Sequence, residues 1–230
     1  RHTRSSVESR GLGDVYKRQA YGWLHPHWIN SFYPEDLPAD WRLGYYSNEF
    51  DTVLVPSFYW QQQSMADCEA LLDAVHPGFQ FFIECDNRIF DMLSLPELFD
   101  ALTQLKPQLS ALVFPGNGQV EKAIDDRYIE LAEKLQVDLI AGQSEPGAEK
   151  LWCSADASKS GQQKARFAIL QDDLLDLRAV RSHIEPFIAQ LQDENEDSTE
   201  ETTAALIVSH PQLQVADLSK LRSMLEIMGH

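Results

Sequence analysis

From about residue 50 onward, short apolar runs alternate with segments whose apolar positions recur at helical spacing. Apolar runs of four to eight residues bounded by turn residues predict buried strands. Seven of them follow residue 50, over 50–55, 79–85, 109–114, 137–141, 150–153, 165–170 and 204–208. The segments between them predict helices over 66–75, 95–105, 125–135, 174–192 and 215–228, because spacings of three and four residues put apolar side chains on one helix face.

Near-continuous apolar strands that alternate with helices are typical of a parallel sheet covered on both faces. An eighth strand is predicted to end near Tyr21–Trp23, where the next aromatic run begins. Eight strand–helix units predict an α/β fold of the TIM-like (β/α)8 barrel type, in one domain over residues 20–230. The alternative is an open doubly wound sheet, although the chain has neither a GxGxxG nor a Walker A motif.

The first nineteen residues differ in character from the rest. Residues 1–19 have little apolar periodicity and carry five basic against two acidic residues. Their sequence is similar to the translated read-through of a sequencing adapter, so we interpret residues 1–19 as a non-native segment. The first strand is then expected to be incomplete or built from non-native residues. The alternative is a natural disordered basic arm that contacts nucleic acid.

The charge of the whole chain restricts its partners. The 230 residues include 19 Lys and Arg against 36 Asp and Glu, a net charge of −17. Such a chain is unsuited to neutralising the phosphates of a nucleic acid or to docking on an anionic membrane. A small-molecule ligand is therefore expected in preference to either partner.

The cysteines and the lengths of the apolar runs indicate where in the cell the protein is located. Cys68, Cys85 and Cys153 are far apart in sequence, which disfavours a zinc knuckle or a disulfide framework and favours free thiols in a reducing compartment. No apolar run approaches the length of a membrane span, and no signal peptide is visible. We expect a cytoplasmic protein.

Several aromatic motifs in the first part of the chain are similar to those of a known family. They are Tyr21–Trp28 (YGWLHPHW), Phe32–Pro34 (FYP), Phe50–Val53 (FDTV) and Ser57–Tyr59 (SFY). In order and spacing they resemble the opening of the YecE-like family, domain of unknown function 72. The later strands match more loosely. The resemblance implies a TIM-like barrel and does not imply an established activity.

The polar residues expected from that resemblance have been replaced. Where the family has Glu and Asn on its second strand, this chain has Leu54 and Pro56. Substitutions on the later strands put other residues at the family's polar positions, namely Glu84, Val113, Ala168, Ser209 and His210. If the family's polar residues carry out chemistry, this member is not expected to carry out the same chemistry.

A metal site is one hypothesis for the carboxyl ends of the strands, where TIM barrels form their active sites. The candidate metal ligands are His25, His27, Asp86 and His210. A mixed shell of imidazoles and carboxylates suits a divalent ion such as Zn, Mn or Fe, which would activate a water molecule to hydrolyse phosphoester or sugar substrates. The alternative is that His25 and His27 hydrogen-bond locally around Pro26.

Paired carboxylates are a second hypothesis. Glu84 follows the third strand and Asp172 the seventh, and a pair of carboxyl groups across a cleft is what glycoside hydrolysis needs. They are the candidate catalytic residues, with aromatic side chains as stacking platforms for a sugar: Trp23, Trp28, Tyr59 and Trp60. The alternative is that these aromatic residues only pack the top of the barrel.

Binding without turnover is the third hypothesis, and the loss of the family's polar residues favours it. A small polar or cationic ligand would contact Trp23, His25, Trp28, Tyr59 and His210. The predicted function is that of a YecE-like barrel protein that binds a small polar ligand at the carboxyl ends of its strands. A metal-dependent hydrolase is the alternative, and the sequence leaves open whether the protein is an enzyme.

Overall fold

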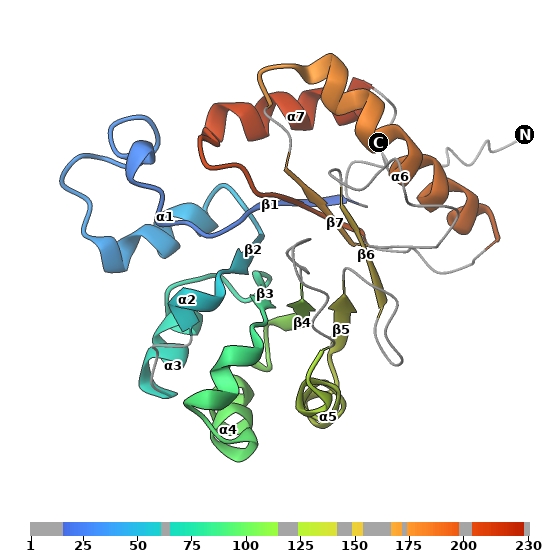
Figure 1. Ribbon diagram of the computed structural model, residues 1–230. Coiled ribbons are helices and arrows are strands. Elements are labelled where there is room, and N and C mark those ends of the chain that lie inside the picture. Colours follow the sequence, from blue (N-terminus) through green and yellow to red (C-terminus); the bar gives the residue numbers. More distant parts are fainter. Residues whose placement is uncertain are drawn as a thin grey trace, which may run out of the picture.

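The computed structural model describes residues 16–60, 65–114, 124–141, 149–153, 167–171, 174–197 and 204–227. Within them, eight strands form one sheet in the order β1-β8-β7-β6-β5-β4-β3-β2, and every neighbouring pair is parallel (Figure 1). The strands are β1 (Tyr16–Ala20), β2 (Thr52–Val55), β3 (Gln80–Glu84), β4 (Leu109–Phe114), β5 (Asp138–Ala141), β6 (Glu149–Cys153), β7 (Phe167–Leu170) and β8 (Ala204–Val208). The predicted α/β fold with a parallel sheet is confirmed.

Helices cover the outside of this sheet (Figure 1). They are α1 (Arg42–Ser47), α2 (Ser57–Trp60), α3 (Met65–Asp73), α4 (Leu95–Leu105), α5 (Asp126–Leu135), α6 (Leu177–Asp197) and α7 (Val215–Ile227). Figure 1 shows α3, α4 and α5 beside β2 to β5, and α6 and α7 beside β1 and β7. The long helix α6 begins later than predicted and continues past its predicted end at residue 192.

Local sequence determines the ends of α4, which match the predicted range. The Glu97 carboxylate accepts hydrogen bonds from the backbone N–H of Ser94 at 2.8 Å and from its hydroxyl at 2.7 Å. The Glu97 carboxylate thus gives the backbone N–H just before the helix a partner, as the Glu of a capping box does. Leu98, Leu102 and Leu105 lie on one face of α4 and are buried against the sheet and the neighbouring helices.

The two faces of the sheet belong to two apolar clusters. Val53 and Val55 belong to the cluster under the helices, whereas Leu54 between them belongs to the cluster on the other face. That second cluster draws alternate residues from six strands: Leu54, Phe82, Ala111, Val113, Ile140, Phe167, Ile169, Ala205 and Ile207. Successive strand residues point to opposite faces, so the alternation follows from strand geometry.

The sheet is curved around this second cluster. The ring centroids of Phe82 on β3 and Phe167 on β7 are 5.7 Å apart. Three strands lie between β3 and β7 in the sheet order, so a flat sheet would hold them roughly 19 Å apart. The sheet must therefore bend until these strands face one another across an apolar interior.

The outermost strands of the sheet order, β1 and β2, are linked just beyond the end of β1. Tyr21 forms an isolated parallel bridge with Leu54, and the N–H of Gly22 donates to the Leu54 carbonyl at 2.8 Å. The N–H of Tyr21 also donates to the carbonyl of Val208 on β8 at 3.0 Å. Except for Ala20, the residues of β1 belong to the segment with the adapter-like sequence.

Two further sequence expectations concern thiols and membranes. Cys85 is a free and buried thiol and Cys68 is buried, whereas the side chain of Cys153 lies outside what the structure describes. Over the described ranges, no helix combines the length and the apolar character needed to cross a membrane.

Candidate functional site

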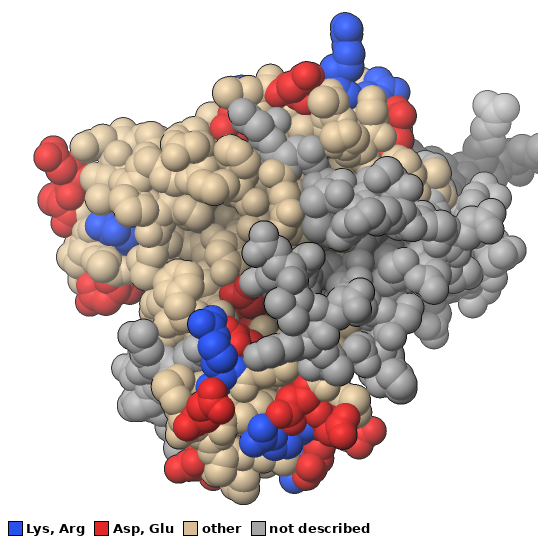
Figure 2. All heavy atoms as spheres, in the orientation of Figure 1, with Lys and Arg blue, Asp and Glu red and all other residues tan. Residues whose placement is uncertain are grey.

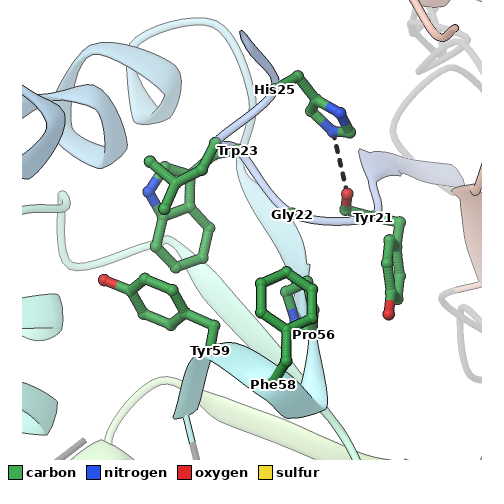
Figure 3. Close-up of a pocket in the computed structure, with 8 residues that line it drawn as sticks. Tyr21, Gly22, Trp23, His25, Pro56, Phe58 and Tyr59 are labelled. Atoms are coloured by element: carbon green, nitrogen blue, oxygen red, sulfur yellow. Dashed lines mark hydrogen bonds between the residues drawn. The ribbon is translucent and has the colours of Figure 1, made fainter. Parts of the chain in front are cut away.

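A pocket lies between the segments that follow β1 and β2. Because the strands are parallel, both segments leave the sheet at the same edge, the carboxyl ends. The pocket has a cavity volume of about 110 Å³. Its described lining is mainly aromatic and apolar (Figure 3): Tyr21, Gly22, Trp23, Leu24, His25, Pro56, Phe58 and Tyr59.

One wall of the pocket is a fixed aromatic pair. The rings of Trp23 and Tyr59 meet edge to face, with centroids 4.6 Å apart and an interplanar angle of 69°. The Trp23 side chain is buried, and its backbone carbonyl accepts a 2.8 Å hydrogen bond from the hydroxyl of Tyr33. Phe58 lies across from Trp23 in Figure 3 and is 63% exposed, so its ring offers open apolar surface at the mouth.

Gly22 brings the two segments together. Its φ of 76° lies in the left-handed region that L residues with side chains rarely adopt. A Cβ atom at this position would lie 3.2 Å from Cγ of Pro56. The close approach of the segment after β1 to the end of β2 therefore depends on glycine at position 22.

Glu84, at the end of β3, joins three strand ends beside the pocket. Its Oε2 accepts a hydrogen bond from the Tyr21 hydroxyl at 2.7 Å and one from the backbone N–H of Ser57 at 2.7 Å. Its backbone carbonyl accepts a 2.7 Å hydrogen bond from the indole N–H of Trp60. Burial and the nearby Glu84 charge raise the pKa of Tyr21. The phenol therefore stays protonated and donates a hydrogen bond to the carboxylate.

His25 is a neutral ring at the edge of the pocket. Its Nε2 lies 3.0 Å from the Tyr21 carbonyl oxygen, which can only accept, so Nε2 carries the proton in this contact (Figure 3). The ring also packs on Trp28, with centroids 4.3 Å apart. Burial, and next the proximity of His27, lower the pKa of His25 from 6.5, so the ring is uncharged at neutral pH.

His27 and Trp28 attach the segment after β1 to the segment before α7. Nε2 of His27 and the indole N–H of Trp28 both donate to the carbonyl of Leu213, each at 2.6 Å. The Trp28 side chain is fully buried and is not among the residues that line the pocket. Both side chains therefore act as packing and anchoring groups here.

The candidate metal ligands do not come together. The Asp86 carboxylate accepts from the backbone N–H of Arg88 at 2.9 Å and from its Nε at 2.7 Å, and His210 Nδ1 accepts from the N–H of Gln212 at 3.2 Å. Among the residues that the structure describes, no three His, Cys, Asp or Glu side chains are placed to hold a metal ion. Asp172, the other candidate catalytic residue, lies outside the described residues.

The pocket lining thus includes three of the predicted ligand contacts, Trp23, His25 and Tyr59, whereas Trp28 and His210 are not among the residues that line it. Sequence reasoning missed Phe58 and Tyr21 as pocket residues. The Ser57–Tyr59 motif directly after the second strand was the available signal for Phe58. Tyr21 begins the Tyr21–Trp28 motif, but its hydrogen bond with Glu84, which is distant in sequence, could not be predicted from that motif.

Charge is unevenly spread over the face shown in Figure 2. Acidic and basic side chains gather over α4 and α5, and acidic side chains are visible in the hollow at the centre of the view. In contrast, the residues that line the pocket include no Lys, Arg, Asp or Glu. The described part of the lining is therefore uncharged, and the Tyr21 hydroxyl contacts the Glu84 carboxylate.

Comparisons with solved structures agree with this architecture. A DUF72 family protein from Thermotoga maritima is 13% identical, with a TM-score of 0.55, over 92% of this chain and 99% of that chain. A DUF72 family protein from Enterococcus faecalis is 9% identical, with a TM-score of 0.53, over 94% and 98% of the two chains. D-psicose 3-epimerase from Clostridium cellulolyticum, solved with D-tagatose, is 12% identical, with a TM-score of 0.51, over 92% and 97%. At such identities these likenesses concern the fold alone.

A comparison with curated proteins finds no match. The model of one protein family, described as protein of unknown function DUF72, matches residues 20–191. This range includes the aromatic motifs and every residue that lines the pocket. The chain therefore belongs to the DUF72 family, which is the YecE-like family that its aromatic motifs resemble.

Proposed function

We propose that this protein binds a small polar molecule, without turnover, in the pocket at the carboxyl ends of β1 and β2. The observation that carries the proposal is the aromatic cavity between Trp23, Tyr59 and Phe58, with one wall buried and the other exposed. Its volume of about 110 Å³ is smaller than the roughly 150 Å³ apolar cavity that holds a benzene molecule. The pocket therefore suits one compact group of a ligand, and its exposed side leaves the rest of the ligand in solvent.

The proposal includes a closed TIM-like (β/α)8 barrel. The bridge between Tyr21 and Leu54 supports closure, and so does the contact of Phe82 with Phe167 across the interior. In this architecture the carboxyl ends of the strands form the binding face. D-psicose 3-epimerases, which act on small sugars, share the fold, and their chemistry is not transferred to this chain by the likeness.

Binding without turnover is supported by the state of the polar groups. The Glu84 carboxylate, proposed from sequence as a catalytic group, already accepts hydrogen bonds from Tyr21 and Ser57. Leu54, Val113 and Ala168, at positions where the family pattern is polar, are fully buried apolar residues. The dispersed candidate ligands give no support to a metal-dependent hydrolase. The free, buried thiol of Cys85 suits a reducing compartment, so we propose a cytoplasmic location.

Ligand-observed NMR tests this proposal. Saturation-transfer spectra of the protein with monosaccharides, sugar phosphates, amino acids and organic ammonium compounds would identify a bound class. Leu24→Trp puts a larger side chain at the pocket mouth, where Leu24 is 37% exposed, and should abolish the signals. Ile227→Trp, at the exposed end of α7, is the matched control and should leave them unchanged.

Two results would contradict the proposal. In the first, the only compound that binds keeps its full signals with Leu24→Trp, which would place it outside the pocket. The other is conversion of a bound compound, seen as new resonances that appear with time, which would make the protein an enzyme. Retained ligand signals without new resonances would support binding without turnover.

A further inference from the structure

We infer that the part of the ligand held in this pocket is an organic cation of the methylated ammonium type, such as a trimethylammonium group. The inference rests on the proposed function and names its ligand class. It depends on three features of the lining: aromatic rings on several sides, few free hydrogen-bonding groups, and a carboxylate behind one of the rings.

Four aromatic side chains line the pocket. Trp23 and Tyr59 form one side, Phe58 lies across from them, and Tyr21 is at the far side from Trp23 (Figure 3). The face of an aromatic ring carries partial negative charge and attracts a cation held within about 6 Å of its centre. Methylated ammonium groups are weakly hydrated, and several rings arranged around one site are the usual way that proteins hold them.

The electrostatics of the site favour positive charge. Oε2 of Glu84 accepts the Tyr21 hydroxyl hydrogen at 2.7 Å, which draws electron density toward the Tyr21 ring and puts a carboxylate behind it. The lining residues include no Lys or Arg, and His25 is uncharged at neutral pH. The net charge of −17 attracts a cation to the protein from a distance.

The same lining is less suited to a sugar. Each sugar hydroxyl that enters a pocket needs a hydrogen-bond partner there. The Tyr21 hydroxyl is already bonded to Glu84, and the Tyr21 carbonyl to His25. Ring faces and prolyl and leucyl carbons make up most of the remaining described lining. A methylated cation presents only C–H groups and charge, and so loses no hydrogen bond in such a site.

The test compares choline with 3,3-dimethyl-1-butanol, in which carbon replaces the quaternary nitrogen and the shape is kept. Isothermal titration calorimetry should give choline an affinity about tenfold or more above that of the neutral alcohol. Phe58→Leu, at an exposed position that folding does not require, should weaken choline about tenfold, and Phe58→Tyr should restore it. Trp41→Leu, at an exposed aromatic residue outside the lining, is the control and should leave choline affinity unchanged.

The outcomes separate this inference from the proposed function. Equal affinity for choline and the alcohol, with both lost in Leu24→Trp, would overturn the cation inference and leave a pocket that binds small molecules. Binding of monosaccharides but not choline, again sensitive to Leu24→Trp, would do the same. If no compound of any class binds in a way that Leu24→Trp abolishes, the proposed function fails and the inference with it.

Discussion

The hydroxyl of Tyr21, just after β1, donates a 2.7 Å hydrogen bond to Oε2 of Glu84 at the end of β3. The same oxygen accepts the N–H of Ser57 after β2, so one carboxylate holds the ends of three parallel strands beside the pocket. An acidic residue at the carboxyl end of a barrel strand suggests catalysis when it is seen in sequence alone. Here its contacts are those of a structural acceptor.

Removal of the Glu84 carboxylate should destabilise the fold. Glu84→Ala leaves the Tyr21 hydroxyl and the Ser57 N–H without their acceptor, which should lower the free energy of unfolding by about 2–3 kcal/mol. Urea unfolding measures this change. Glu133→Ala, on the exposed face of α5, is the matched control, and its effect should stay within about 0.5 kcal/mol. Equal small effects of both variants would contradict the structural role of Glu84.

Acid should weaken the folded state through His25. Its pKa is lowered from 6.5 in the folded protein, so the unfolded chain binds more protons below about pH 6.5. The stability held by the neutral ring is present above that pH and is lost as the pH falls through the lowered pKa. His25→Gln should therefore lose less stability than the wild type between pH 7 and pH 5 in urea unfolding. An identical loss in His25→Gln and in the wild type would refute the prediction.

Substitution of Gly22 should strain the junction of the two pocket segments. Gly22→Ala adds a Cβ at φ 76° and 3.2 Å from Pro56, and the left-handed conformation alone costs about 1–2 kcal/mol. Gly78→Ala is the matched control because its Cβ would meet only ordinary contacts of 3.4 Å or more, and its change should be within about 0.5 kcal/mol. Thermal or urea unfolding distinguishes the two, and a fully stable Gly22→Ala would be inconsistent with this backbone.

Trp28 should contribute to stability. Trp28→Phe removes an indole N–H that donates at 2.6 Å to Leu213 and leaves unfilled volume at a fully buried position, a loss of about 2 kcal/mol. Trp41→Phe, at a residue that is 65% exposed, should change stability by less than about 0.5 kcal/mol. If both variants unfold at the same urea concentration as the wild type, Trp28 does not anchor the segment after β1.

Most of the sheet and its covering helices could be predicted because their signals are local. The helix over 95–105 and the strands over 109–114 and 204–208 are observed with the predicted bounds. The short helices α1 and α2 were not predicted, since six and four residues are too few to show a helical periodicity. Contacts with residues distant in sequence hold them: the Ala20 N–H donates to the Tyr46 hydroxyl on α1, and the Trp60 indole N–H on α2 donates to the Glu84 carbonyl.

The site was harder to predict, because proximity to a strand end does not say which way a side chain points. Trp28 and Phe58 both follow strands, yet Trp28 is fully buried while Phe58 is exposed at the pocket. Glu84 was proposed as catalytic since its hydrogen-bond partners could not be identified without the fold. The candidate metal ligands also do not converge. Each of these side chains forms a hydrogen bond with another group of the protein, which the sequence alone does not reveal.

A crystallographic screen of small fragments shows where on the molecule ligands bind, and so tests whether this pocket is the binding site. Fragments with a compact apolar or cationic head should bind between Trp23, Phe58 and Tyr59, at the carboxyl ends of β1 and β2. Fragments bound repeatedly at another place, such as the amino ends of the strands, with this pocket empty in every crystal, would contradict this prediction.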